Sequence, residues 1–152
     1  MSAESSIQSH YPKAVAQCFG CGAHNPAGHQ LQSFGRGDHT VAHFTPKPEH
    51  MAIPGFVYGG LIASLIDCHG TGTGTWAALN AGEAGDPIPR FVTGKLEVSY
   101  EKPTPMGVEL ELIGRVREQS ARKVVVDIEL SAAGVVTAEG TVIAVRMPES
   151  WG

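Results

Sequence analysis

Residues 54–67 read PGFVYGGLIASLID, and the rest of the chain is interpreted around them. A proline-glycine turn leads to the pair Gly59-Gly60, which opens an apolar run with helical spacing. Glycines at a helix start let another molecule approach bare backbone N–H groups, and the helix dipole favours negative charge there. The run contains a single carboxylate, Asp67, whose ionised form is costly to bury unless something stabilises it. The stretch therefore predicts a helix start that binds an oxygen and a carboxylate that takes part in chemistry.

The composition of the chain limits the classes of protein to consider. The chain has 152 residues, 42% of them hydrophobic, and a net charge of −4 with seven histidines counted as neutral. These values are typical of one globular domain, and the acidic balance disfavours a general nucleic-acid binder. No apolar run reaches the length of a membrane helix, and residues 1–10 lack the apolar core of a signal peptide. The three cysteines give no even disulfide framework, so we expect a reduced, cytoplasmic protein without a membrane partner.

The periodicity of the sequence predicts the order of its elements. Residues 1–16 are polar without a clear period and predict an N-terminal tail or a loosely packed lead-in, followed by a single domain over residues 17–152. A long helix is expected from Gly59 to about residue 79, and the alternative is that it ends near Gly70. The expected strands cover residues 31–34 and 39–45 before the helix, and residues 90–100, 108–112, 123–130 and 136–145 after it. Their short connections favour antiparallel neighbours, so the order predicts an α+β architecture with a curved antiparallel sheet around one long central helix.

Three short motifs resemble a known family. The letters VYGG at residues 57–60, followed by LID at residues 65–67, resemble the HGG…D motif of hotdog-fold acyl-CoA thioesterases of the PaaI type. The letters YEKP at residues 100–103 are similar to the family's Y-x-x-P, and CFGCG at residues 18–22 is similar to a lead-in that many members carry. The resemblance covers residues 18–146 and implies a hotdog fold that hydrolyses a coenzyme A thioester. The chain departs from the family pattern at Tyr58, which replaces a histidine, and at Ala52 and Ile53, which stand where many members carry an asparagine.

The resemblance assigns roles to the glycine pair and to the acid. It implies that the Gly59 N–H, with Gly60, stabilises the thioester oxygen as it becomes an oxyanion, and that Asp67 is either the nucleophile or the general base. Eight residues separate Gly59 from Asp67, which is about 12 Å along a helix, whereas both must come within about 3 Å of one carbon. We therefore expect a homodimer or a dimer of dimers with shared sites. The alternative is that Asp67 is a buried acid tied to Ser64 or Thr71.

Further residues are candidates for binding the substrate. Thr93 lies where family members often carry Ser or Thr near the acid, and it is expected to hold the attacking water; alternatively it is only a good β-former. Tyr58, at the motif position, is expected to contact the substrate. Because the chain is acidic, the phosphates of coenzyme A need local cations. The expected cations are Arg90, Arg115, Arg117, Arg122 and Lys123, each of which has a plain alternative as a solvated strand end.

Metal and cofactor chemistry is not expected. Cys18 and Cys21, with His24 and His29, are zinc-ligand types, but no second C-x-x-C closes a site with four ligands. Cys68 is expected to pack as a small core residue. Two other functions stay open: a hotdog hydratase, which needs a histidine-acid pair, and a non-catalytic acyl-CoA-binding protein.

Overall fold

A computed structural model describes residues 4–83 and 85–151, and its core is one helix covered by a sheet. Within these ranges the helix is α1 (Gly59–Asn80), and short 3-10 turns lie at Gln8–His10, Lys13–Val15, Pro48–His50 and Glu149–Trp151. The strands are β1 (Ser33–Arg36), β2 (His39–Phe44), β3 (Phe91–Tyr100), β4 (Leu110–Gln119), β5 (Lys123–Ala132) and β6 (Val135–Arg146). The expected order of two strands, a helix and four strands is confirmed.

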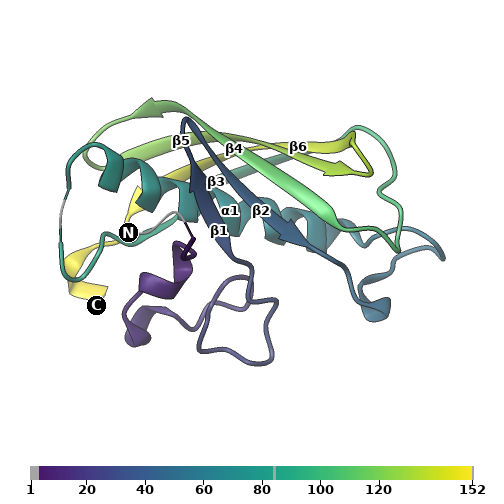
Figure 1. Ribbon diagram of the computed structural model, residues 1–152, viewed down its shortest axis with the longest axis horizontal. Helices are drawn as coiled ribbons and strands as arrows, with labels where there is room; N and C mark the ends of the chain where they lie inside the picture. Colours follow the sequence, from purple (N-terminus) through teal and green to yellow (C-terminus); the bar gives the residue numbers. More distant parts are fainter. Residues whose placement is uncertain (1–3, 84, 152) are drawn as a thin grey trace.

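All six strands form one antiparallel sheet in the order β1-β2-β4-β5-β6-β3. The sheet curves over α1, which packs against β1, β3, β4, β5 and β6 (Figure 1). The expected hotdog fold is therefore confirmed. β3 and β1 lie at the two edges of the sheet, so each leaves one side of its backbone ladder unpaired within the described chain.

The glycines in the second half of α1 let the helix lie directly on the sheet. A Cβ atom on Gly70 would come within 2.5 Å of the Val142 side chain in β6, and one on Gly74 within 3.0 Å of Ala144. The helix runs through both glycines without interruption, so the alternative of an end near Gly70 is wrong. Close approach of the helix to the sheet compensates for the weak helix propensity of these residues.

The larger differences from the expected strand boundaries lie in β1 and β4. β1 begins at Ser33, two residues later than expected, and β4 continues to Gln119 beyond the expected end at residue 112. The alternation in β4 is hidden by Gly114, where a Cβ atom would lie 2.6 Å from the Thr40 hydroxyl. A glycine is needed at this point, and it interrupts the apolar pattern from which the strand was predicted.

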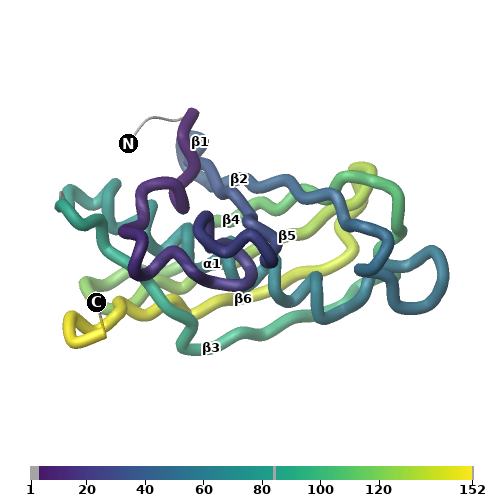
Figure 2. The backbone as a smooth tube through the Cα atoms, turned by 90° about the horizontal axis from the view of Figure 1, so that it is seen from below, coloured from purple at the N-terminus to yellow at the C-terminus, as the bar shows by residue number. Residues whose placement is uncertain are grey.

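The N-terminal segment is packed, which corrects the expectation of a loose tail for residues 4–16. Ile7 is fully buried and Tyr11 is 6% exposed. The Gln8 side chain accepts a 2.8 Å hydrogen bond from the Ser33 backbone N–H and donates one to the Ser33 hydroxyl. Figures 1 and 2 show this segment on the side of α1 that faces away from the sheet. Residues 1–3 of the expected tail lie outside the described residues.

A buried polar network joins α1 to the first two strands. The His69 ring lies between the Ser33 hydroxyl, 2.8 Å from its Nδ1, and the Thr40 hydroxyl, 3.0 Å from its Nε2. Burial lowers the pKa of His69 to about 4, so the ring is neutral. His69 is therefore a packed core residue, and it fixes the position of the helix turn that carries Asp67.

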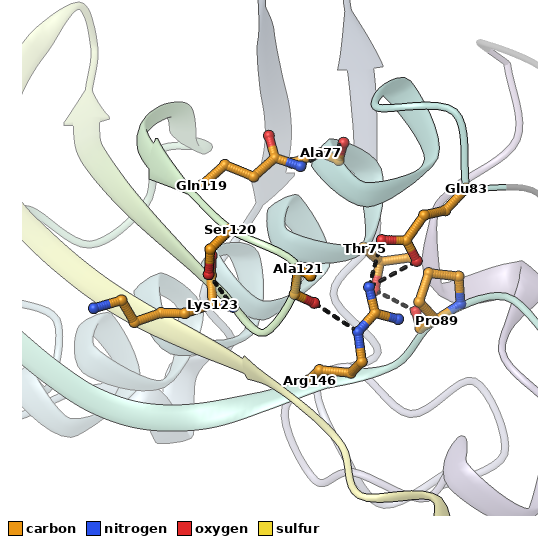
Figure 3. A network of polar contacts seen from close by, with 9 residues as sticks. All are labelled: Thr75, Ala77, Glu83, Pro89, Gln119, Ser120, Ala121, Lys123 and Arg146. Carbon is orange, nitrogen blue, oxygen red and sulfur yellow. Dashed lines mark hydrogen bonds and ion pairs between the residues drawn. The ribbon is translucent and has the colours of Figure 1, made fainter.

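A second network fastens the far end of α1, as Figure 3 shows. Arg146 forms a two-pronged ion pair with Glu83, at 2.5 and 2.7 Å, and donates to the Ala121 carbonyl. The Gln119 amide donates a 3.0 Å hydrogen bond to the Ala77 carbonyl. The hairpin between β4 and β5 is therefore attached to the C-terminal end of the helix.

Candidate active site

Asp67 lies half-buried on α1, facing the edge strand β3. Its Oδ1 atom accepts a 2.5 Å hydrogen bond from the Thr93 hydroxyl. Burial raises the pKa of Asp67 above its ordinary value, and the hydrogen bond from Thr93 partly offsets this effect. Thr71 instead donates to the Cys68 carbonyl, and the Ser64 hydroxyl has no partner among the described residues. Neither Ser64 nor Thr71 therefore holds the acid, and the hydroxyl beside Asp67 is that of Thr93, whose role in holding a water stays a prediction.

The start of α1 presents the backbone of the glycine pair. The first hydrogen bond of the helix runs from Leu61 N to the Tyr58 carbonyl at 3.1 Å, and the Tyr58 side chain does not cap the helix. The N–H groups of Gly59 and Gly60 precede that bond, so they belong to the unsatisfied donors of a helix N-terminus. The Tyr58 ring lies against Gly60, because a Cβ atom on Gly60 would lie 2.4 Å from it. The hydroxyl of Tyr100, at the end of β3, donates a 2.7 Å hydrogen bond to the Gly59 carbonyl.

An open pocket of about 480 Å³ lies beside Gly59. Lys102 is part of its wall, so a cation and a largely apolar surface meet near the helix start. Lys102 was not predicted as part of the site, although the motif at residues 100–103 contains it and could have indicated it. The apolar part of the lining comes from Ile53, Phe56, Val57, Ile62, Tyr100 and Pro103.

The two halves of the expected site lie apart within one chain. Gly59 contacts Tyr100 at the end of β3, whereas Asp67 contacts Thr93 near its beginning. α1 therefore runs in the opposite direction to β3, with Gly59 and Asp67 about 12 Å apart along the helix. One described chain holds both parts but does not bring them to a common point.

Three of the five expected cations gather at the end of the sheet that carries Thr93. Thr93 pairs with Ala144, and Ala144 pairs with Val124, so the Lys123 backbone lies roughly 10 Å across the sheet from Thr93. Lys123 alternates with the buried Val124, so its side chain lies on the outer face of the sheet, where it lines the same hollow as Arg117. Arg122 precedes Lys123 in the same hairpin. The Lys123 side chain extends away from the Arg146 network (Figure 3).

Arg90 directly precedes β3 at this same end of the sheet. Its guanidinium stacks over the Tyr11 ring at 4.4 Å and donates to the Val15 carbonyl. Its positive charge also opposes the rise in the pKa of Asp67, although burial of the acid dominates. Arg90 is therefore tied to the N-terminal segment while remaining close to the acid.

Arg115 and Arg117 lie on the opposite face of the sheet from α1. Leu110, Leu112 and Gly114 of β4 face the helix, so the alternate residues point outward. Arg117 forms an ion pair with Asp127 on β5, with contacts of 2.9 and 2.5 Å, and the Arg115 guanidinium lies 3.9 Å from Asp38. Within one chain these two arginines are not brought to Asp67, and their phosphate-binding role stays a prediction.

The three cysteines come together, which the sequence analysis did not foresee. The sulfur atoms of Cys18, Cys21 and Cys68 all lie within 4.8 Å of one another. Cys68 is buried, as expected, but it also joins the C-x-x-C pair from a position next to Asp67. His24 and His29 are not part of this group. The cysteine sulfurs are thus the atoms in the described chain that could hold a metal ion.

A helix wrapped by an antiparallel sheet, with a glycine-rich helix start and an acid on the same helix, defines a hotdog-type protein. The family model described as Thioesterase superfamily matches residues 54–139, which include both groups. The chain therefore belongs to the thioesterase superfamily.

Solved structures carry the comparison further. A thioesterase superfamily protein from Shewanella loihica PV-4 is 58% identical, over 78% of this chain and 91% of that chain, with a TM-score of 0.67. A Bacillus halodurans protein with CoA is 24% identical, over 80% of this chain and 76% of that chain, with a TM-score of 0.62. A Streptococcus mutans protein bound to acetyl CoA is 18% identical, over 77% and 88%, with a TM-score of 0.61. The last two share the fold.

Two searches gave negative results. No curated protein matched the chain. Among the helices in residues 4–83 and 85–151, none combines the length and the hydropathy needed to cross a bilayer.

Proposed function

We propose that this protein is an acyl-CoA thioesterase of the PaaI type, working as a homodimer or a dimer of dimers with shared active sites. The observation that carries the proposal is the position of Asp67, a half-buried acid with a raised pKa that is held by Thr93 at an open sheet edge. A carboxylate in such surroundings is suited to proton transfer or attack rather than to a structural ion pair. The uncapped glycine pair on the same helix supplies the complementary oxyanion donor.

The chemistry assigns one step to each group. Asp67 takes a proton from a water held by Thr93, and the water oxygen attacks the carbonyl carbon of the thioester. The negative charge that develops on the carbonyl oxygen is stabilised by the Gly59 N–H, with the dipole of α1 behind it. When the tetrahedral intermediate collapses, the C–S bond breaks and the proton leaves with the coenzyme A sulfur. In the alternative route, Asp67 attacks directly and water hydrolyses the resulting anhydride.

The proposed dimer follows from the edge strand. β3 has one free ladder side and carries Thr93 near one end and Tyr100 at the other. Two copies of β3 can pair antiparallel about a two-fold axis near residues 96–97, which sets Tyr100 of one protomer beside Thr93 of its partner. Because Tyr100 is bonded to Gly59 and Thr93 to Asp67, this arrangement brings the glycine of one chain to the acid of the other.

Binding of the substrate draws on two regions. The apolar pocket beside Gly59 suits the hydrophobic part of an acyl-CoA, and Lys102 at its wall suits an anionic group. Arg122 and Lys123, at the end of the sheet that carries Thr93, suit the phosphates of coenzyme A. Proteins of the same fold bound to CoA and acetyl CoA support this substrate class.

Two other functions compete with this proposal. A hydratase needs a histidine beside the acid, whereas the side-chain partner of Asp67 among the described residues is Thr93. A non-catalytic acyl-CoA binder is favoured by Tyr58, which lies against Gly60 in place of the family's histidine. Asp67→Asn separates the binder from the enzyme, because it keeps the shape of the side chain and removes its charge.

The test is thiol release from a panel of acyl-CoA esters that differ in length and aromaticity. We expect wild-type hydrolysis of at least one ester, and Asp67→Asn to lose roughly 1,000-fold or more in kcat while its affinity for that ester stays within about threefold. The variant is expected to unfold at the same or a higher temperature, because burying a neutral asparagine side chain costs less free energy than burying an ionised aspartate. Tight binding of the esters by wild-type protein without any thiol release would instead identify a binder.

A further inference from the structure

The three cysteine sulfurs form a compact group between the N-terminal segment and α1. Cys18 and Cys21 come from the loop that crosses the side of the helix away from the sheet, and Cys68 comes from the helix itself (Figure 2). The sulfur atoms of Cys18 and Cys68 are 3.8 Å apart, and all three lie within 4.8 Å of one another. Cys21 and Cys68 are buried, whereas Cys18 is half-exposed, so the group opens to solvent on one side.

The spacing is that of ligands on one tetrahedral ion. Zinc–sulfur bonds are about 2.3 Å long, which sets two thiolates on one tetrahedral zinc ion about 3.8 Å apart. This value matches the separation of the Cys18 and Cys68 sulfurs, and the third sulfur needs only a small movement to join them. Three sulfurs of this kind favour a borderline-soft cation such as Zn²⁺ over Mg²⁺ or Ca²⁺.

The loop backbone is shaped around the sulfurs. A Cβ atom on Gly20 would lie 2.3 Å from the Cys68 sulfur, so only a glycine lets the loop close over that residue. The Gly20 N–H donates a 3.4 Å hydrogen bond to the Cys18 sulfur, which favours its thiolate form. A Cβ atom on Gly22 would meet the Cys18 backbone at 2.5 Å, so the turn is tight on both sides of Cys21.

The surroundings can balance the charge of such a site. Three thiolates and one Zn²⁺ leave a single negative charge, and Arg90 is close enough to Cys21 for its positive charge to act on that residue. The Arg90 guanidinium stacks over the Tyr11 ring at 4.4 Å, which holds this positive charge at the N-terminal segment.

We propose that Cys18, Cys21 and Cys68 bind one Zn²⁺ ion as thiolates, with the fourth position filled from solvent on the side of Cys18. Binding releases the three thiol protons and forms three zinc–sulfur bonds. The ion fastens the loop that contains Cys18 and Cys21 to α1, at the residue next to Asp67. The site is thus a structural clamp, and it does not depend on the proposed hydrolysis.

The test uses the reduced full-length chain, freed of metal with a chelator and titrated first with Co²⁺ and then with Zn²⁺. We expect one Co²⁺ per chain with the intense thiolate-to-cobalt charge-transfer absorption, and its loss when Zn²⁺ displaces the cobalt. Cys18→Ser, Cys21→Ser and Cys68→Ser should each weaken Zn²⁺ binding by at least tenfold. His24→Ala, which removes a nearby zinc-ligand type outside the group, should leave the affinity unchanged.

A second measurement keeps the test decisive if a serine variant fails to fold. In the wild-type chain, the half-exposed Cys18 should react with a thiol reagent when metal-free and become protected by stoichiometric Zn²⁺. Zn²⁺ should also raise the unfolding temperature of the wild-type chain. The proposal is overturned if cobalt binds without charge-transfer absorption, if saturating Zn²⁺ leaves Cys18 reactive, or if the reduced chain takes up no metal and a disulfide forms instead.

Discussion

Thr93 on the edge strand β3 donates a 2.5 Å hydrogen bond to Asp67 on α1, across 26 residues of sequence. This bond fixes the acid of the helix at the free edge of the sheet, where a second chain or a substrate can reach it. Burial raises the pKa of Asp67, and this hydrogen bond opposes the rise because it stabilises the ionised carboxylate. The consequences for activity can be measured.

Thr93→Val should lower the activity and move its pH dependence. Without the hydroxyl, the pKa of Asp67 rises further, so the acidic limb of the kcat/KM profile should shift to higher pH. A hydrogen bond to a charged group contributes about 1.5–3 kcal/mol, which corresponds to a loss of roughly 10- to 100-fold at low pH. Thr93→Ser keeps the hydroxyl and should retain most of the activity and the original limb. An unshifted limb in Thr93→Val would contradict the proposed role.

Gly59→Pro should remove the oxyanion donor while leaving the helix in place. Proline is well tolerated at the first helical position, and Tyr58 already has φ −59° and ψ 129°, which suits a residue before proline. The loss of one oxyanion donor typically costs 100- to 1,000-fold in kcat, so we expect about that decrease. Gly59→Ala keeps the N–H, and its Cβ would meet the Tyr100 ring at an ordinary 3.4 Å. Gly59→Ala should therefore stay far more active. Equal losses in the two variants would mean that the added side-chain atoms, and not the loss of the N–H, cause the decrease.

Mixing two inactive variants tests whether the active sites are shared between chains. Asp67→Asn and Gly59→Pro protomers, unfolded together and refolded, should form mixed dimers with one intact site each. With random pairing, the mixture should recover about one quarter of the wild-type activity. The same variants refolded separately and then assayed together serve as the control. If each site lay within one chain, no activity would return, and this result would remove the dimer from the proposal without removing the thioesterase.

The double variant Arg122→Glu/Lys123→Glu should bind coenzyme A esters less tightly. These residues lie at the end of the sheet that carries Thr93, so reversing their charge should raise KM several-fold with kcat nearly unchanged. Arg115→Glu should have a smaller effect, because Arg115 pairs across the sheet with Asp127, farther from that end, and lies near Asp38. Lys13→Glu/Lys47→Glu matches the change in net charge at exposed positions and serves as the control. An equal rise in KM in that control would indicate a general charge effect.

The regular part of the fold could be predicted from the sequence because its signals are local. The helix starts at Gly59 as expected, since a glycine pair followed by an apolar run marks a helix start in any context. The four later strands follow a period of two, and their short connections fix antiparallel pairing. The errors came where tertiary contacts decide. Gly114 interrupts the apolar alternation in the middle of β4. Residues 4–16 are packed because Ile7 and Tyr11 form a buried apolar cluster against which Trp76 of α1 packs.

The residues of the candidate site could likewise be predicted only where local signals identify them. Gly59 and Asp67 could be singled out from residue type and spacing alone, and Thr93 from its place in a family motif. The placement of the cations was not predictable, because sheet order and register decide which strand positions share an end of the sheet, and strand alternation turns Lys123, like Arg115, away from α1. Nor was the union of Cys68 with Cys18, since 50 residues separate them and no local pattern encodes that distance.

The sequence by itself determined that an apolar, glycine-started helix carries one acid and must be covered by a sheet, because periodicity and the cost of burial act within a few neighbouring residues. Only the tertiary structure decided what meets what: the acid with the edge strand, the tyrosine of that strand with the helix start, and the three sulfurs with one another. These contacts join segments that are far apart in the sequence, and the packing of the whole molecule decides which of those segments lie side by side.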